Sequence, residues 1–300
     1  MVDCFRQILV ASDLSPRADR AVSRAWQIAA QHDAVLTVLH VVEPIGGSGV
    51  PHAAWERLAE TPEGAEKTLR QEAEAALRRQ VDRDRTPGPS SVDILTRVGD
   101  PLPEILDQVR QRSTELAVIG AHGRHYMRDR LLGTLAESVV RSGACPVLVV
   151  RIKPAYHYQR LFVPVDFSDA SRKALVVARR LAPRAQLLVM HADEIRPEEG
   201  VHAHGITSDQ LRALRREREL TLREALRNFV GTAGLDLDAV TLLVQHGNPD
   251  TAIVRASTDF HADLMAIGTR NVAGMGHLLL GSVARHTLRE ARCDVLAVHP

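Results

Sequence analysis

The sequence predicts two tandem α/β domains, each built on a doubly wound sheet of five parallel strands. Three observations lead to this fold class. The 300 residues fit two domains of about 150 residues each. The chain repeats itself on the scale of a domain, which indicates duplication rather than a solenoid. Within each repeat, short apolar runs alternate with helical patterns, as they do in open parallel sheets.

The repeat is visible when residues 99–150 are set against residues 247–298 without a gap. Identical residues recur along this alignment, among them Gly99/Gly247, Pro101/Pro249, Ile105/Ile253, Gly120/Gly268, Met127/Met275, Gly133/Gly281, Cys145/Cys293 and Leu148/Leu296. The starts also match, because VASDLS at 10–15 aligns with VPVDFS at 163–168. We therefore expect domains at 1–152 and 160–300, joined by a short polar linker that contains Pro154.

The elements of the first repeat follow from its apolar patterns. We expect strands at Gln7–Ala11, Ala34–Val42, Val92–Val98, Leu116–Gly120 and Pro146–Val150, and helices at Pro16–Gln31, Gly64–Val81, Pro101–Arg112 and Gly133–Ser142. Runs such as LAVIG and PVLVV are continuously apolar, which is typical of strands buried on both faces of a parallel sheet. The second repeat follows the same order, with a long helix at Ser208–Val230 whose apolar face comprises Leu211, Leu214, Leu222, Leu226 and Phe229.

Composition narrows the class of partner. The 38 basic and 37 acidic side chains give a formal net charge of +1, so no general attraction to nucleic acid or to an anionic membrane is expected. No apolar run is long enough to span a membrane, and the N-terminus lacks the layout of a secretory signal. The three cysteines are far apart in the sequence, which favours a cytoplasmic protein without a disulfide framework.

A glycine motif follows the fourth predicted strand of the first repeat. Gly120-Ala-His-Gly123 ends this strand, and nine residues later Gly133-Thr134 opens a helix. Glycines let backbone N–H groups approach anionic oxygens, and a helix N-terminus adds free donors and a positive dipole end. The Thr134 hydroxyl can donate to a phosphate, Arg124 can contact one directly, and His122 adds positive charge. The motif therefore predicts a phosphate site.

Two further positions would complete a nucleotide site at the carboxyl ends of the strands, where such folds bind ligands. Asp13 ends the first strand and can accept hydrogen bonds from a ribose. The backbone of Val41, at the end of the second strand, can pair with an adenine edge. Simpler interpretations stay open: the glycines form turns, Thr134 is a helix N-cap, and Asp13 caps the helix that starts at Pro16.

These residues together resemble the universal stress protein family in its tandem two-domain form. The resemblance covers nearly the whole chain and rests on ILVASDLS and LFVPVDFS, VLHVVE and VMHADE, the GDP and GNP turns, GAHG(x9)GT, and the endings CPVLVV and CDVLAV. It implies a Rossmann-like fold of the adenine nucleotide alpha hydrolase-like type. The last strands, Pro146–Val150 and Asp294–His299, would then pair within one chain as a pseudo-dimer, with a homodimer as a further state.

The resemblance also implies ATP as a ligand, with magnesium as its companion ion and no other metal. One branch of the family binds ATP through Gly-x2-Gly-x9-Gly-Ser/Thr. By resemblance, Asp13 contacts ribose, Val41 the adenine edge, and the motif the phosphates. The full expected set in the first repeat is Ala11, Ser12, Asp13, Val41, Gly120, His122, Gly123, Arg124, Gly133, Thr134 and Leu135.

The second repeat departs from this motif. It reads Gly268-Thr-Arg-Asn271, and Gly281-Ser282 follow nine residues later. Asparagine tolerates a left-handed backbone, yet its side chain would intrude where a phosphate packs. We expect weaker binding here, and a nucleoside without tight phosphate contacts stays an alternative. The candidate residues of this repeat are Asp166, Gly268, Arg270, Gly281 and Ser282.

The sequence leads to an ATP-binding stress regulator that responds to nucleotide by changing its protein partners. A weak ATPase or autokinase is one alternative, although neither a Walker A motif nor a kinase set is present. A nucleotide-independent scaffold is the other. Four residues, His191, Asp193, His202 and His204, suggest a metal site only weakly, with surface histidines as the simpler interpretation.

Overall fold

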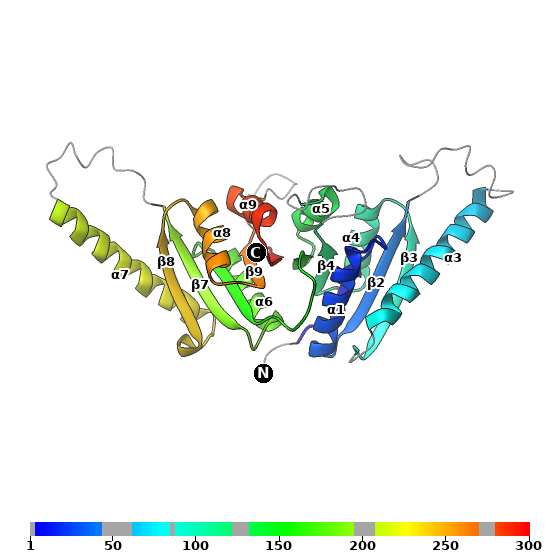
Figure 1. Cartoon of the computed structure of the whole chain (residues 1–300), viewed down its shortest axis with the longest axis horizontal. Helices are drawn as coiled ribbons and strands as arrows, with labels where there is room; N and C mark the ends of the chain where they lie inside the picture. The colour runs from blue at the N-terminus through cyan, green and yellow to red at the C-terminus, as the bar shows by residue number, and fades with distance from the viewer. Residues whose placement is uncertain (1–3, 44–61, 85–87, 122–131, 195–207, 270–279) are drawn as a thin grey trace. The chain divides into compact units, whose positions relative to one another are not determined.

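The computed structural model describes residues 4–43, 62–84, 88–121, 132–194, 208–269 and 280–300 (Figure 1). The chain divides into two compact units, of which the first ends at His157 and the second begins at Tyr158. Each unit is an α/β domain built on parallel strands. None of the helices in the described ranges is both long and apolar enough to cross a membrane.

Unit 1 contains a five-stranded sheet in the order β3-β2-β1-β4-β5, and every pair in it is parallel. The strands are β1 (Gln7–Ala11), β2 (Val35–Val42), β3 (Ser91–Val98), β4 (Leu116–Gly120) and β5 (Val147–Val150). The chain adds β2 and β3 on one side of β1 and then crosses to β4 on the other side. The strand order therefore reverses between β1 and β4.

Among the residues that the structure describes, four helices cover the two faces of this sheet. They are α1 (Ala18–His32), α3 (Pro62–Val81), α4 (Pro101–Gln111) and α5 (Thr134–Ser142), and a 3-10 turn (Asp82–Asp84) follows α3. Helices α1 and α3 lie on one face, whereas α4 and α5 lie on the other (Figure 1). Strands β1, β4 and β5 are almost entirely buried, as their continuously apolar sequences predict.

Unit 2 repeats this architecture with the order β10-β9-β6-β7-β8, again parallel throughout. Its elements are β6 (Arg160–Val165), α6 (Asp169–Leu181), β7 (Gln186–Asp193), α7 (Ser208–Thr232), a 3-10 turn (Leu237–Ala239), β8 (Val240–His246), α8 (Pro249–Asp259), β9 (Leu264–Gly268), α9 (Ser282–Glu290) and β10 (Asp294–Val298). The reversal lies between β6 and β9. The predicted fold class, two doubly wound domains with five parallel strands each, is confirmed.

The long helix α7 is only partly packed. Leu226 and Phe229 are buried and Leu222 is half-buried, as the predicted apolar face requires. Leu220 lies in the more exposed half of the helix, with 69% of its surface accessible. The remaining members of the predicted face, Leu211 and Leu214, lie outside the described side chains.

The segment between the units is anchored by polar contacts on each side. In unit 1, Arg20 Nη1 donates to the Arg151 carbonyl (2.9 Å), and the buried Arg24 donates to the Tyr156 carbonyl (2.8 Å). In unit 2, the Tyr158 hydroxyl donates to Asp294 Oδ2 (2.7 Å). Both partners of this last bond are buried, so removing the hydroxyl would leave a carboxylate oxygen short of a donor.

We predict that Tyr158→Phe lowers the free energy of unfolding of unit 2 by about 1–3 kcal/mol, because a buried carboxylate loses a donor. Urea denaturation checks this. The matched control is Tyr156→Phe, since the Tyr156 side chain is 77% exposed and its loss should cost less than about 0.5 kcal/mol. Equal stability of Tyr158→Phe and wild type would contradict the structural role given to this bond.

The three cysteines differ in their access to solvent. Cys4 is exposed and Cys293 is buried. Burial raises the pKa of the Cys145 thiol to about 12, against a smaller opposing effect of a backbone hydrogen bond from Ala117. Because the thiolate is the reactive form, Cys145 is a poor nucleophile near neutral pH.

We predict that iodoacetamide at pH 8 modifies Cys4 of the folded protein well before Cys145 or Cys293, and modifies all three in urea. Peptide mass spectrometry measures the three rates. Labelling of Cys145 at the rate of Cys4 would contradict the high pKa of its thiol.

Candidate functional site

The reversal of strand order in unit 1 lies where the sequence places its candidate residues. Asp13 follows β1 and Gly120 ends β4, and these strands are neighbours, with Ala11 paired to Ile119. Val41 lies on the adjacent strand β2, beyond the last residue that β1 pairs. All three predicted positions therefore share the carboxyl edge at the switch point, which is the usual ligand position in open α/β sheets.

The two halves of the glycine motif are joined by a backbone hydrogen bond. The Gly133 amide donates to the Ala121 carbonyl (2.8 Å), so the end of β4 and the start of α5 lie side by side. This bond occupies the Gly133 amide, and the free donors must come from the residues that follow it. Three predicted site residues, His122, Gly123 and Arg124, lie outside the described residues.

The start of α5 retains unsatisfied backbone donors. Gly133 is the N-cap, with φ −65° and ψ 148°, and no side chain caps the helix. The described helices α4, α6 and α8 instead have side-chain caps, from Asp100, Ser168 and Asn248 respectively. Thr134 is the first helical residue rather than the N-cap, and it is exposed. With Leu135 behind it, it presents backbone N–H groups and a positive dipole end to an anion.

Asp13 belongs to a tight turn between β1 and α1. Its Oδ1 accepts from the Ser15 amide (3.0 Å), and Ser15 Oγ accepts from the Ala18 amide (3.1 Å). Ser15, not Asp13, therefore supplies the side-chain oxygen that accepts a hydrogen bond at the start of α1. Leu14 between them has a left-handed backbone, with φ 62°, which costs a non-glycine residue free energy and is often found at functional sites.

A buried polar network supports this turn, and sequence reasoning missed it. Ser12 Oγ donates to Gln80 Oε1 (2.7 Å) and accepts from the Leu14 amide (3.1 Å). Gln80 in turn donates to Asp19. Gln80 lies in the last turn of α3, far from the motif in sequence, so no local signal pointed to it.

Unit 2 keeps the backbone of the turn after its first strand, and its first motif glycine is tightly packed. Asp166 Oδ1 accepts from the Ser168 amide (3.1 Å), and Phe167 has φ 63°, as Leu14 does. A Cβ on Gly268 would lie 2.6 Å from the Ser171 nitrogen, so this glycine has a packing reason that is independent of any ligand.

The start of α9 has more free space than the surroundings of Gly268. A Cβ on Gly281 would meet no atom within 4 Å, and no side chain caps the helix. Ser282 is the exposed first residue of α9. Arg270 and Asn271, the remaining motif positions of unit 2, lie outside the described residues.

The polar network of unit 1 is replaced by rings in unit 2. Phe167 packs against His191 with ring centroids 4.4 Å apart and against Phe229 at 5.7 Å. The Arg172 guanidinium lies 5.3 Å from the centroid of Phe229. Val165 stands where unit 1 has Ser12. Aromatic and cation–π contacts therefore support the second site where unit 1 has the Ser12–Gln80 hydrogen bond.

Asp193, the carboxylate of the weakly suggested metal site, forms an ion pair with Arg218. Arg218 donates to both oxygens of Asp193, at 2.8 and 2.6 Å. Hydrogen bonding by Arg218 is the largest of the effects that lower the pKa of the buried Asp193 carboxyl. Across the described ranges, no group of three or more metal-ligating side chains is present. His202 and His204 lie outside those ranges.

We predict that Asp193→Asn lowers the free energy of unfolding at pH 7 by about 1–2 kcal/mol, because the charged hydrogen bonds from Arg218 are lost. This magnitude is reduced for the solvent exposure of Arg218, since water screens the interaction. A depressed pKa stabilises the fold above the unfolded value of about 3.9, and this contribution is lost as the pH falls through the folded pKa. The difference in the free energy of unfolding between the variant and the wild type should therefore shrink as the pH falls from about 5 to 2. Urea titrations across this range check it, and a gap independent of pH would contradict the ion pair.

The fold and the site define a tandem pair of doubly wound domains with a candidate anion site at the carboxyl edge. Residues 5–151 and 157–299 each match the model of the universal stress protein family. The chain therefore belongs to the universal stress protein family, in a form with two copies of the domain.

Full-length relatives share this tandem form. A universal stress protein of Mycobacterium tuberculosis (strain ATCC 25618 / H37Rv) is 27% identical over 295 residues, which cover 96% of this chain and 95% of the relative. The crystal structure of a universal stress protein from Archaeoglobus fulgidus DSM 4304 covers 98% of both chains, with a TM-score of 0.62 and 20% identity. A universal stress protein solved in complex with cAMP matches 50% of this chain and 98% of its own, with 25% identity and a TM-score of 0.38.

Proposed function

We propose that unit 1 binds ATP, with magnesium, at the carboxyl edge of its sheet. The observation that carries the proposal is the uncapped start of α5, hydrogen-bonded to the end of β4 at the reversal of strand order. In this proposal the phosphates contact Gly120, Gly123, Arg124, Gly133 and Thr134. Asp13 accepts hydrogen bonds from the ribose, and the Val41 backbone pairs with the adenine edge.

The proposal assigns tighter nucleotide binding to unit 1 than to unit 2. Asn271 replaces the second motif glycine in the sequence of unit 2, and its side chain competes with phosphate for space. Gly268 has a packing role against α6 that explains its presence without a ligand. The open start of α9 leaves room for a nucleoside or for weak anion binding.

In this proposal the protein is a cytoplasmic stress regulator whose partners change with its nucleotide state. Binding that differs between two states of a protein shifts their populations by the difference in affinity. In unit 1, the turn around Leu14 has a left-handed backbone. A nucleotide that contacts Asp13 would shift the conformational populations of this turn. Pairing of the last strands, within one chain or between two, completes the proposed assembly.

We predict that Thr134→Pro weakens ATP binding to unit 1 by about 10- to 100-fold, because one charge-assisted hydrogen bond from the backbone is lost. Proline suits the first position of a helix, and the extended Gly133 before it accepts a following proline. The helix should therefore keep its start. Isothermal titration of nucleotide-stripped protein with MgATP measures the effect.

Thr134→Ala distinguishes the contribution of the hydroxyl to binding from that of the backbone amide, because it removes only the hydroxyl. Ser282→Pro is the matched control, since it makes the same change at the equivalent helix start of unit 2, and it should leave the tight site intact. Absence of ATP binding to the stripped wild type would refute the proposal. Loss of the tight site in Ser282→Pro, with Thr134→Pro unaffected, would move the site to unit 2.

A further inference from the structure

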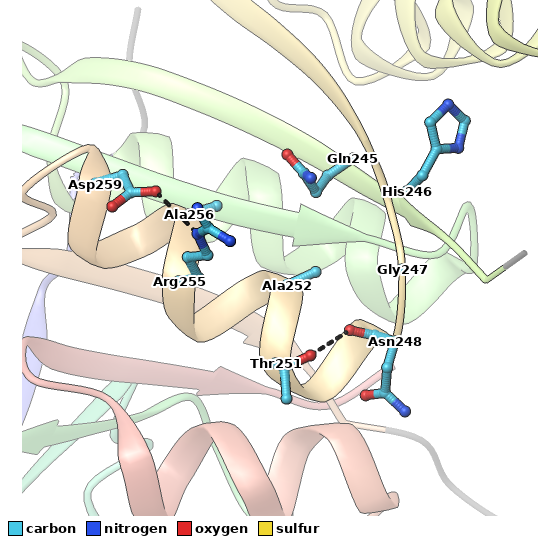
Figure 2. Close-up of a pocket in the computed structure, with 9 residues that line it drawn as sticks. All are labelled: Gln245, His246, Gly247, Asn248, Thr251, Ala252, Arg255, Ala256 and Asp259. Atoms are coloured by element: carbon cyan, nitrogen blue, oxygen red, sulfur yellow. Dashed lines mark hydrogen bonds and ion pairs between the residues drawn. The ribbon is translucent and has the colours of Figure 1, made fainter.

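Unit 2 contains an open groove between the end of β8 and one side of α8, with a volume of about 340 Å³ (Figure 2). It is lined by Gln245, His246, Gly247, Asn248, Thr251, Ala252, Arg255, Ala256 and Asp259. Gln245 comes from β8, whereas Ala252 and Ala256 lie one turn apart on α8 (Figure 2). The groove uses neither the β6 turn nor the start of α9, so it is distinct from the candidate nucleotide site.

The first repeat fills the same place with its own side chains. Gly99 and Gly247 are equivalent, and both have positive φ, 157° and 130°. In unit 1, Oε1 of Glu104 lies 3.0 Å from the position that a Cβ on Gly99 would take. The residue equivalent to Glu104 is Ala252, and no atom lies within 4 Å of the same position on Gly247. The groove therefore has an opening where unit 1 holds a carboxylate.

A second replacement, one turn further along the helix, deepens the groove. Gln108 of unit 1 is 2% exposed, and its Oε1 accepts from Arg112 Nε (3.3 Å). Its equivalent in unit 2 is Ala256, and the equivalent of Arg112 is Phe260. A carboxylate and a carboxamide side chain, four residues apart, are thus both reduced to methyl groups in unit 2.

The formal charge of the lining residues also differs between the two units, and it is less negative in unit 2. The nine equivalent positions of unit 1 hold one base and three acids, a formal charge of −2, from Arg97, Asp100, Glu104 and Asp107. The groove holds one base and one acid, a formal charge of zero with His246 neutral, from Arg255 and Asp259. Arg255 replaces Asp107, and Asn248 replaces Asp100. The groove has therefore lost three acidic side chains that would repel an anion and gained one, Asp259, in place of Gln111.

We propose that this groove binds a small aliphatic dicarboxylate of four to five carbons. One carboxylate occupies the space over Gly247, as the Glu104 carboxylate occupies the space over Gly99 in unit 1, and the carbon chain lies on the methyl groups of Ala252 and Ala256. Gln245 supplies an amide donor. Arg255 supplies the cation, because its pair with Asp259 is long (3.7 Å) and exposed and so holds it weakly. The volume lies at the lower end of the range of small-molecule sites, about 300–1,000 Å³.

The experiment titrates the full-length, isotope-labelled protein with glutarate and follows backbone amide shifts by NMR. Glutaramide, of similar size and without charge, is the matched probe. The expected result is saturable shifts confined to 245–259 with glutarate, and affinity at least tenfold weaker for glutaramide. Absence of saturable shifts there, or equal affinity for both probes, would overturn the proposal.

Variants borrowed from unit 1 test the geometry. Ala252→Glu restores the side chain that fills this place in the first repeat and should abolish the glutarate shifts. Arg255→Asp, also borrowed from unit 1, should weaken binding at least tenfold. Thr258→Glu is the control, because it adds the same charge to an exposed position of α8 outside the groove, and it should bind within twofold of wild type. Undiminished binding in Ala252→Glu, with a native spectrum, would overturn the proposal.

Discussion

The hydrogen bond from the Gly133 amide to the Ala121 carbonyl ties the start of α5 to the end of β4, and the candidate site of unit 1 depends on it. Eleven residues separate Ala121 from Gly133 in the sequence, and this bond joins the two halves of the motif directly. Its consequence is that free amides at the start of α5 lie at the reversal of strand order, beside the β1 turn. The helix dipole favours an anion at this end, and the lack of a side-chain cap leaves the amides free to bind it.

The two units show how one backbone design accommodates different chemistry. Both keep a left-handed residue after the first strand, Leu14 or Phe167, and an aspartate that accepts from the amide two residues later. Beneath this shared turn, unit 1 uses the Ser12–Gln80 hydrogen bond, whereas unit 2 uses packed rings. The backbone that forms the site is thus preserved while its support changes.

The fold was predictable from the sequence because its signals are local and repeated. Apolar runs such as Leu116–Gly120 are long enough to mark buried strands, and the duplication checks each assignment twice. Positions at strand ends, such as Asp13 and Gly120, were also within reach, since parallel strands bring their carboxyl ends to one edge. Their roles toward a nucleotide stay predictions.

Other features depend on contacts that no local pattern encodes. Gln80 meets Ser12 across a separation of 68 residues, and Arg218 reaches Asp193 from the middle of a long helix. The packing role of Gly268 required knowing that α6 lies against β9. The groove over Ala252 did have a signal in the sequence, because the alignment of the repeats places Glu104 opposite this alanine. That signal becomes meaningful only once the space over Gly247 is seen.

The central claim is that backbone donors at the start of α5 hold the phosphates of a nucleotide. The most direct measurement follows the backbone amide resonances of the nucleotide-stripped protein as MgATP is added. The account predicts the largest saturable shifts at Thr134 and Leu135, with smaller ones at Ser282 and Val283. Saturable shifts that leave Thr134 and Leu135 unmoved would contradict it.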